Sequence, residues 1–128
     1  MGRKTSTKVT TDTSLVTTAE TDAGEVTGIT TGGPGKTIRV SGWAQVTAGV
    51  GATALTARIR RGQGITGALV GEGNPVTVAA GNTVEVEVET EDVPGDVDHQ
   101  AYTLTVQQTA ATGNGTALQA EVAAEVSD

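Results

Sequence analysis

The feature that most constrains the fold of this chain is a strict two-residue alternation of valine and glutamate. Within the stretch 83–90, valine occupies positions 84, 86 and 88, and glutamate occupies positions 85, 87 and 89. Successive side chains of a β-strand point to opposite faces, so the pattern predicts a half-buried strand. The valine face belongs to a core, and the glutamate face meets water or a basic partner.

The same alternation recurs along the chain in stretches 37–47, 54–61 and 102–106, with shorter candidate strands at 14–18, 25–30, 68–70 and 76–79. Clusters of Gly, Pro and Asn separate these stretches and are typical of turns. Many short strands at regular spacing indicate a β-sandwich or barrel. We therefore expect an all-β, antiparallel fold with one core, because 128 residues suit a single domain.

The last segment, 116–126, fits two structures. Leu118, Val122 and Val126 match a helical stripe, whereas apolar residues at every second position from 118 to 126 match a strand. We expect a strand, because a turn at Asn114 and Gly115 would let it form a hairpin with the strand at 102–106.

The core must be built from small side chains. Hydrophobic residues make up 36% of the chain and aromatic residues only 2%, namely Trp43 and Tyr102. Each large aromatic side chain would bury ~150–250 Å², and the absence of cysteine removes disulfides and thiolate metal sites. Self-association, or docking onto a larger surface, is the remaining way to supplement such a core.

Residues 1–12 carry no periodicity and only one candidate core residue, Val9, so we expect a flexible N-terminal arm ahead of a domain over 13–128. The arm holds Arg3, Lys4 and Lys8, which we expect to bind the partner, whereas the whole chain has a net charge of −7. That charge argues against nucleic acid as a partner. No apolar stretch follows the arm that could act as a signal peptide or span a membrane, so we expect no membrane partner and synthesis in the cytoplasm.

We expect no enzymatic activity and no cofactor. The chain has one histidine and no cysteine, and no serine stands in a nucleophile-elbow pattern. The stretch 62–67 spells the letters of a dinucleotide-binding fingerprint, but that motif needs a helix directly after it. Gly73, Asn74 and Pro75 leave no room for one, so we expect a turn.

An acidic stretch at 91–99 is the one candidate metal site. Glu91, Asp92, Asp96 and Asp98, beside His99, offer oxygen ligands, of which Ca²⁺ takes ~6–8. The spacing differs from that of an EF-hand loop. We expect a solvated acidic turn without metal, and Ca²⁺ binding is the alternative.

Trp43, Arg58 and Arg60 are predicted on outward faces of strands that follow one another in the sequence. Trp and Arg are enriched at binding hot spots, so these residues are the candidate subunit interface. The alternative for Trp43 is that it packs under a loop.

Four segments resemble the jelly-roll domains of tailed-phage capsid decoration (cement) proteins and related minor virion proteins. They are Ile-Arg-Val-Ser-Gly-Trp at 38–43, Ala-Leu-Thr-Ala-Arg-Ile-Arg-Arg-Gly at 54–62, Asp-Val-Pro-Gly at 92–95 and Tyr-Thr-Leu-Thr-Val-Gln at 102–107. The resemblance covers about residues 25–126 and includes no catalytic motif.

The resemblance implies a jelly-roll β-sandwich of about eight strands, often a homotrimer, on the exterior of an icosahedral capsid. There it would bridge subunits of the major capsid protein. A carbohydrate-binding or host-attachment jelly-roll module of a phage is the alternative function. That alternative would need a platform of aromatic side chains for sugar rings.

Overall fold

The computed structural model describes residues 3–15, 18–30, 35–94, 100–109 and 115–126, which form ten β-strands. The strands are β1 (Arg3–Val9), β2 (Thr13–Leu15), β3 (Thr21–Ile29), β4 (Ile38–Thr47), β5 (Thr53–Arg61), β6 (Leu69–Glu72), β7 (Val76–Val78), β8 (Thr83–Asp92), β9 (Gln100–Gln108) and β10 (Gly115–Val126). Nothing in these residues forms a helix long and apolar enough to cross a membrane.

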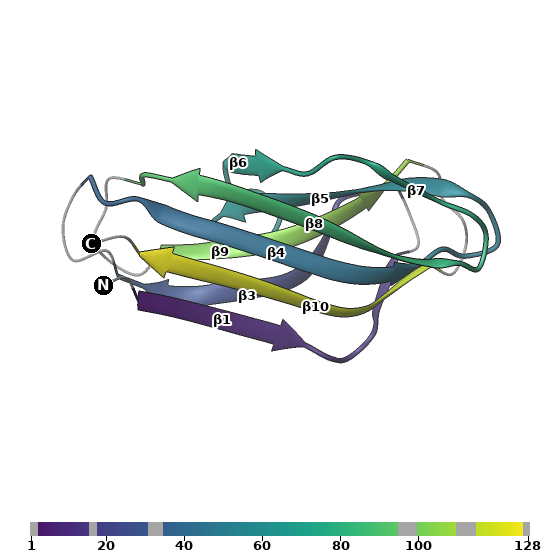
Figure 1. Ribbon diagram of the computed structural model, residues 1–128, viewed down its shortest axis with the longest axis horizontal. Helices are drawn as coiled ribbons and strands as arrows, with labels where there is room; N and C mark the ends of the chain where they lie inside the picture. The colour runs from purple at the N-terminus through teal and green to yellow at the C-terminus, as the bar shows by residue number, and fades with distance from the viewer. Residues whose placement is uncertain (1–2, 16–17, 31–34, 95–99, 110–114, 127–128) are drawn as a thin grey trace.

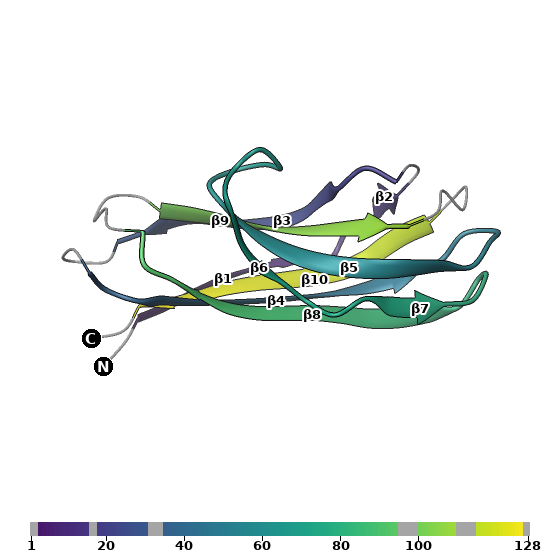
Figure 2. The ribbon, with the colours of Figure 1, turned by 90° about the horizontal axis from the view of Figure 1, so that it is seen from above.

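Two antiparallel sheets pack face to face, with the long strands along the long axis of the molecule (Figures 1 and 2). Sheet A has the order β1-β10-β4-β8, and β2 also pairs with β10. Sheet B has the order β3-β9-β5-β6, and β7 also pairs with β5. Apart from the short strands β2 and β7, this is the arrangement of a jelly roll, in which the first and last strands lie side by side. The expected all-β jelly-roll sandwich is confirmed.

The core lies between the sheets and follows the predicted alternation. On β8, Val86 and Val88 are buried, whereas the glutamates between and beside them are exposed. Valine, isoleucine, leucine and alanine fill most of the interior, and Tyr102 is the one fully buried aromatic side chain in the described part of the chain. The inward side chains of the two sheets therefore pack together in a core made mostly of small residues.

Residues 3–9 are not a free arm in the structure. They form β1, which pairs with β10 along its whole length, from Arg3 opposite Val126 to Val9 opposite Ala120. The stretch contains threonines, and β-branched threonine suits a strand even though it gives no apolar signal. The flexible arm expected over 1–12 is thus corrected: the sandwich begins at β1, not at residue 13.

The strand predicted over 116–126 is confirmed as β10, but its predicted hairpin partner is wrong. β10 pairs with β4 and β1 in sheet A, whereas β9 lies in sheet B. The register also shifts between Ala117 and Gln119. This bulge explains why Leu118 is only half-buried while Ala117 and Ala120 are buried.

The glycine-rich stretch 62–67 is a turn, as predicted, and connects β5 to β6. Figure 2 shows this connection projecting beyond sheet B, on the side away from sheet A. A Cβ atom added at Gly67 would lie 1.7 Å from the carbonyl oxygen of Arg61. Only glycine lets the backbone fold back this closely.

Candidate interaction surface

The outward residues of sheet A form ordered columns of charge, which together we call the sheet A face. The columns are Lys4, Ser6 and Lys8 on β1; Glu125, Ala123, Glu121 and Gln119 on β10; Arg39, Ser41, Trp43 and Gln45 on β4; and Glu91, Glu89, Glu87 and Glu85 on β8. Cations therefore lie along the β1 edge, and carboxylates lie along the β8 edge.

Trp43 lies in the middle of the sheet A face, on the outward side, as predicted. Its cross-strand neighbours are Glu121 on β10 and Glu87 on β8. The indole Nε1–H donates a hydrogen bond of 3.2 Å to Glu121 Oε1, and the side chain is half-buried. This bond fixes the ring, so the remaining exposed part of the indole is its aromatic surface.

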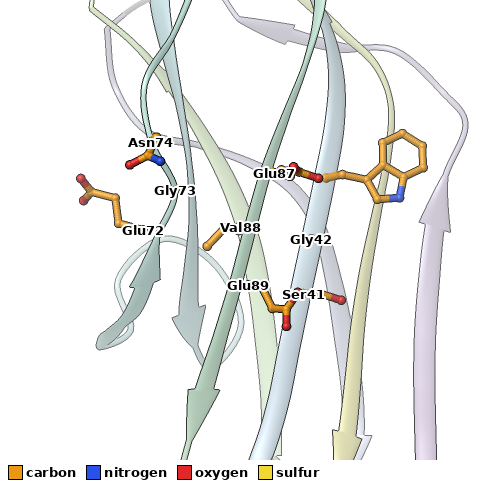
Figure 3. A pocket seen from close by; sticks show the side chains of 9 residues that line it. Ser41, Gly42, Glu72, Gly73, Asn74, Glu87, Val88 and Glu89 are labelled. Carbon is orange, nitrogen blue, oxygen red and sulfur yellow. The ribbon is translucent and has the colours of Figure 1, made fainter.

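A groove of about 390 Å³ opens beside Trp43. One wall is the sheet A face, where Ser41, Glu87 and Glu89 line it. The other wall is the segment 72–74, which begins at the last residue of β6. Figure 3 shows Glu87 and Glu89 on one side and Asn74 on the other, with the carboxylate of Glu72 directed away from the sheet. The groove thus combines an indole with two carboxylates, an amide and a hydroxyl.

The segment 72–74 is held tightly against β8. Gly73 N–H donates a 2.8 Å hydrogen bond to the carbonyl of Ala57, and a Cβ at Gly73 would lie 2.2 Å from the carbonyl oxygen of Glu87. Thr90 Oγ1 adds a 2.7 Å bond to the carbonyl of Val70. This segment therefore covers the β8 edge of sheet A, whereas at the other edge β1 pairs, among the described residues, only with β10.

On sheet B, the outward arginines are bonded to other residues of the fold. Arg60 forms a bidentate pair with Glu20, with N–O distances of 2.8 and 2.7 Å, and donates a third bond of 2.9 Å to the carbonyl of Gly67. Arg58 donates to Glu72 at 2.9 Å and to Gln107. Both arginines are thus held by partners within the fold.

Trp43, Arg58 and Arg60 do not form a single surface patch. All three point outward, but β4 belongs to sheet A and β5 to sheet B. Their outward faces lie on opposite sides of the sandwich, because consecutive strands of the chain enter different sheets.

The turn 62–67 is fastened over sheet B by hydrogen bonds. Gly64 N–H lies 3.0 Å from both Glu25 Oε2 and Thr103 Oγ1, and Thr103 Oγ1 donates to the carbonyl of Gly62 at 2.8 Å. Thr103 and Thr105 are fully buried although they point outward from sheet B. The sheet B outer face is consequently a covered, internally bonded layer.

A bulge in β3 between Asp22 and Gly24 disturbs the alternation, and the carboxyl groups of Asp22 and Glu25 come into contact. Burial, followed by the hydrogen bond and the charge of Glu25, raises the pKa of Asp22 to about 6. By contrast, burial would raise the pKa of Glu20, but its bonds with Arg60 and Thr105 outweigh this and hold the pKa below its usual value.

Asp92 is buried, so it is not part of the solvated acidic turn that was expected over 91–99. It ends β8, with its carboxylate bonded by Arg61 Nε at 2.8 Å and by Tyr102 Oη at 2.7 Å. Burial alone would raise the pKa of Asp92, but the bonds from Arg61 and Tyr102 lower it below the usual value. The cluster ties sheet A to sheet B, since Arg61 and Tyr102 lie on β5 and β9.

The other predicted site residues divide into two groups. Lys4 and Lys8 lie opposite Glu125 and Glu121 across the β1–β10 pair, and Arg3 is the first residue of β1. Asp96, Asp98 and His99 lie outside the described residues. Within the described ones, no three His, Cys, Asp or Glu residues come close enough to hold a metal ion.

The groove beside Trp43 was not predicted from the sequence. The sequence did contain the features that form it, since the glutamates of 83–90 and the outward Trp43 both lay on predicted strands. The missing information was that these two strands are neighbours, which the sequence alone did not indicate.

No protein-family model and no curated protein sequence matches the chain. Among solved structures it is similar to infectious bursal disease virus, Gx strain (TM-score 0.56, 14% identity, 98% of this chain and 32% of that one). It is also similar to the VP2 subviral particle of infectious bursal disease virus, with a TM-score of 0.54 and 15% identity over 97% of this chain and 32% of that one. A xylan-binding domain from Paenibacillus barcinonensis matches more loosely, with a TM-score of 0.40 and 14% identity over 91% of this chain and 83% of that one.

The chain spans about a third of the length of the two virus proteins. At such low identity the likeness establishes the fold: a β-sandwich of the kind that also occurs in a viral capsid protein.

Proposed function

We propose that this chain is a structural protein of a virus particle, without catalytic activity, that binds the exterior of an icosahedral capsid and bridges subunits of its major capsid protein. The observation that carries the proposal is the sheet A face, which has opposite charges at its two edges and, at β1, a strand that pairs only with β10 among the described residues. Such a surface suits docking between proteins, because strand edges pair and charge columns orient the partner.

β1 is the proposed docking strand, and Arg3, Lys4 and Lys8 lie on it. Its backbone edge on the side away from β10 would add to a sheet edge of the capsid through main-chain hydrogen bonds. β1 is already ordered against β10. Binding therefore avoids the ordering cost of roughly 1–2 kcal/mol per residue that a free arm would incur.

The test first asks whether a gene beside that of this chain encodes a major capsid protein, and then measures co-sedimentation of the chain with empty shells of that protein. We expect saturable binding of the native chain and, for Lys4→Glu combined with Lys8→Glu, at least about five-fold weaker binding. Lys36→Glu, which reverses one cation that is not on β1, is the control and should bind like the native chain. A native chain that stays in the supernatant would remove the proposal.

We further propose a homotrimer. A closed ring of copies would bury further apolar surface and so supplement a core that is built from small side chains. Light scattering should give three times the monomer mass. A mass of one chain at all concentrations would exclude the trimer.

A further inference from the structure

We infer that the groove between Trp43 and the segment 72–74 binds an arginine side chain of an extended basic segment on the partner protein. The inference rests on the proposed docking of the sheet A face and names what that face recognises. Its grounds are the charge inside the groove, the aromatic ring beside it and the spacing of its two glutamates on β8.

Two of the three glutamates that line the groove, Glu87 and Glu89, form no ion pair within the described residues, although Arg39 lines a second cavity together with Glu89. Neither glutamate takes part in a side-chain hydrogen bond within those residues, and both are exposed. The nearby Glu72 is already paired with Arg58 at 2.9 Å. Lys8 shares a row with Glu87 but lies three strand spacings away, roughly 14 Å, which is too far for an ion pair.

Trp43 adds an aromatic ring beside this acidic groove; the ring leans toward β10, where its N–H is bonded. Because its N–H is bonded to Glu121, the indole offers a ligand its π surface and not a hydrogen bond. A cation placed over an indole gains about 0.5–1 kcal/mol at exposed sites. Carboxylates beside an indole therefore favour a cationic ligand.

Among cations, arginine fits best. Its guanidinium is planar, can stack on the indole and can donate two parallel bonds to one carboxylate. Lysine would supply a point charge without stacking.

The partner segment should be extended, with cations at every second residue. The two groove glutamates of β8, Glu87 and Glu89, point outward from one strand and so lie about 6.6–6.8 Å apart. An extended chain repeats its side chains on one face at the same interval.

A neutral sugar is the competing ligand, and the structure disfavours it. Stacking on sugar rings would rely on Trp43 alone, since Tyr102 is fully buried. A neutral ligand would also leave both groove carboxylates without a counter-charge.

Trp43 is the only tryptophan in the chain, so its fluorescence reports on the groove. The probe is the peptide acetyl-Thr-Arg-Thr-Arg-Thr-amide, titrated at low salt. We expect a saturable fluorescence change that weakens as salt is added.

Glu87→Gln and Glu89→Gln should each weaken binding about three-fold, and the double variant about ten-fold. Glu85→Gln is the matched control on the same column, outside the groove, and should bind like the native chain. The same peptide with citrulline in place of arginine should not bind.

Three results would overturn the inference: equal loss with Glu85→Gln, binding of the citrulline peptide, or displacement by a xylo-oligosaccharide. The shell assay separates this inference from the proposed function. If the native chain fails to co-sediment, the docking proposal falls whatever the titration gives. If native and Glu87→Gln/Glu89→Gln chains bind shells equally, the groove inference falls and the docking proposal stands.

Discussion

The two outer faces of this sandwich use their charged residues in opposite ways. On sheet B, Arg60 and Glu20 bond each other and the turn 62–67 lies over the strands. On sheet A, glutamates such as Glu87 and Glu89 stand exposed without partners in the described part of the chain. Charge that a fold uses internally stabilises it, whereas charge left exposed in columns is available for binding.

This contrast predicts that stability depends on the internal charges and hardly on the sheet A face. The largest effect should come from Asp92→Asn. The substitution weakens the bonds from Arg61 and Tyr102 that join the sheets, and we expect a loss of about 2–3 kcal/mol in the free energy of unfolding.

Urea denaturation of the variant and the native chain measures this loss. Glu91→Gln is the matched control, because it removes a neighbouring carboxylate whose pair with Arg39 is exposed (59% and 63%) and should cost under about 0.5 kcal/mol. Equal losses in the two variants would mean that the Asp92 cluster does not join the sheets energetically.

The next effect concerns sheet B. Glu20→Gln replaces the carboxylate that accepts from Arg60 and Thr105, and we expect a loss of about 1–2 kcal/mol at pH 7. Because the pKa of folded Glu20 is lowered, its contribution is present above the unfolded pKa and is lost as the pH falls through the folded value.

Unfolding curves at pH 7 and pH 3 test this prediction. The gap between native chain and variant should narrow on acidification. A gap that stays constant would show that the Glu20 charge is not the stabilising element.

The sequence predicted the parts of the molecule that depend on local periodicity. Alternation and turn residues indicated a sandwich with a valine face on β8 and an outward Trp43, and the structure agrees. The predictions that were wrong concern strand pairs and contacts between residues far apart in the sequence. The sequence did not indicate that β9 and β10 enter different sheets, or that Asp92 meets Arg61, 31 residues away.

The prediction of a flexible arm where β1 lies was wrong for another reason. Its inward positions are Thr5, Thr7 and Val9, and threonine gives no apolar signal. It forms a strand because it pairs with β10, which lies more than a hundred residues later in the sequence.

A smaller effect should appear as a pH dependence of opposite sign at Asp22. Its pKa is raised to about 6, so its contribution is fully present below the unfolded pKa of about 3.9 and is lost as the pH rises through 6. Asp22→Asn mimics the protonated form and should stabilise the fold at pH 7.5. Solvent screening of this partly exposed group limits the gain to about 1 kcal/mol.

Thermal unfolding at pH 4 and pH 7.5 measures the difference, which should vanish at the lower pH. Asp12→Asn, at an exposed position between β1 and β2, is the control and should show no such trend. A variant less stable than the native chain at pH 7.5 would contradict the destabilising burial of the Asp22 charge beside Glu25.

The smallest effect is expected on the sheet A face itself. Glu85→Gln, Glu87→Gln and Glu89→Gln each remove a carboxylate without an ion pair in the described residues. Neighbouring glutamates of the column lie about 6.6–6.8 Å apart and repel one another weakly through water. Each change should therefore leave the free energy of unfolding within about 0.5 kcal/mol, with a slight gain where repulsion falls. Urea titrations at low salt measure it. A loss comparable to that of Glu20→Gln would mean that both faces use their charges structurally, and the contrast between them would collapse.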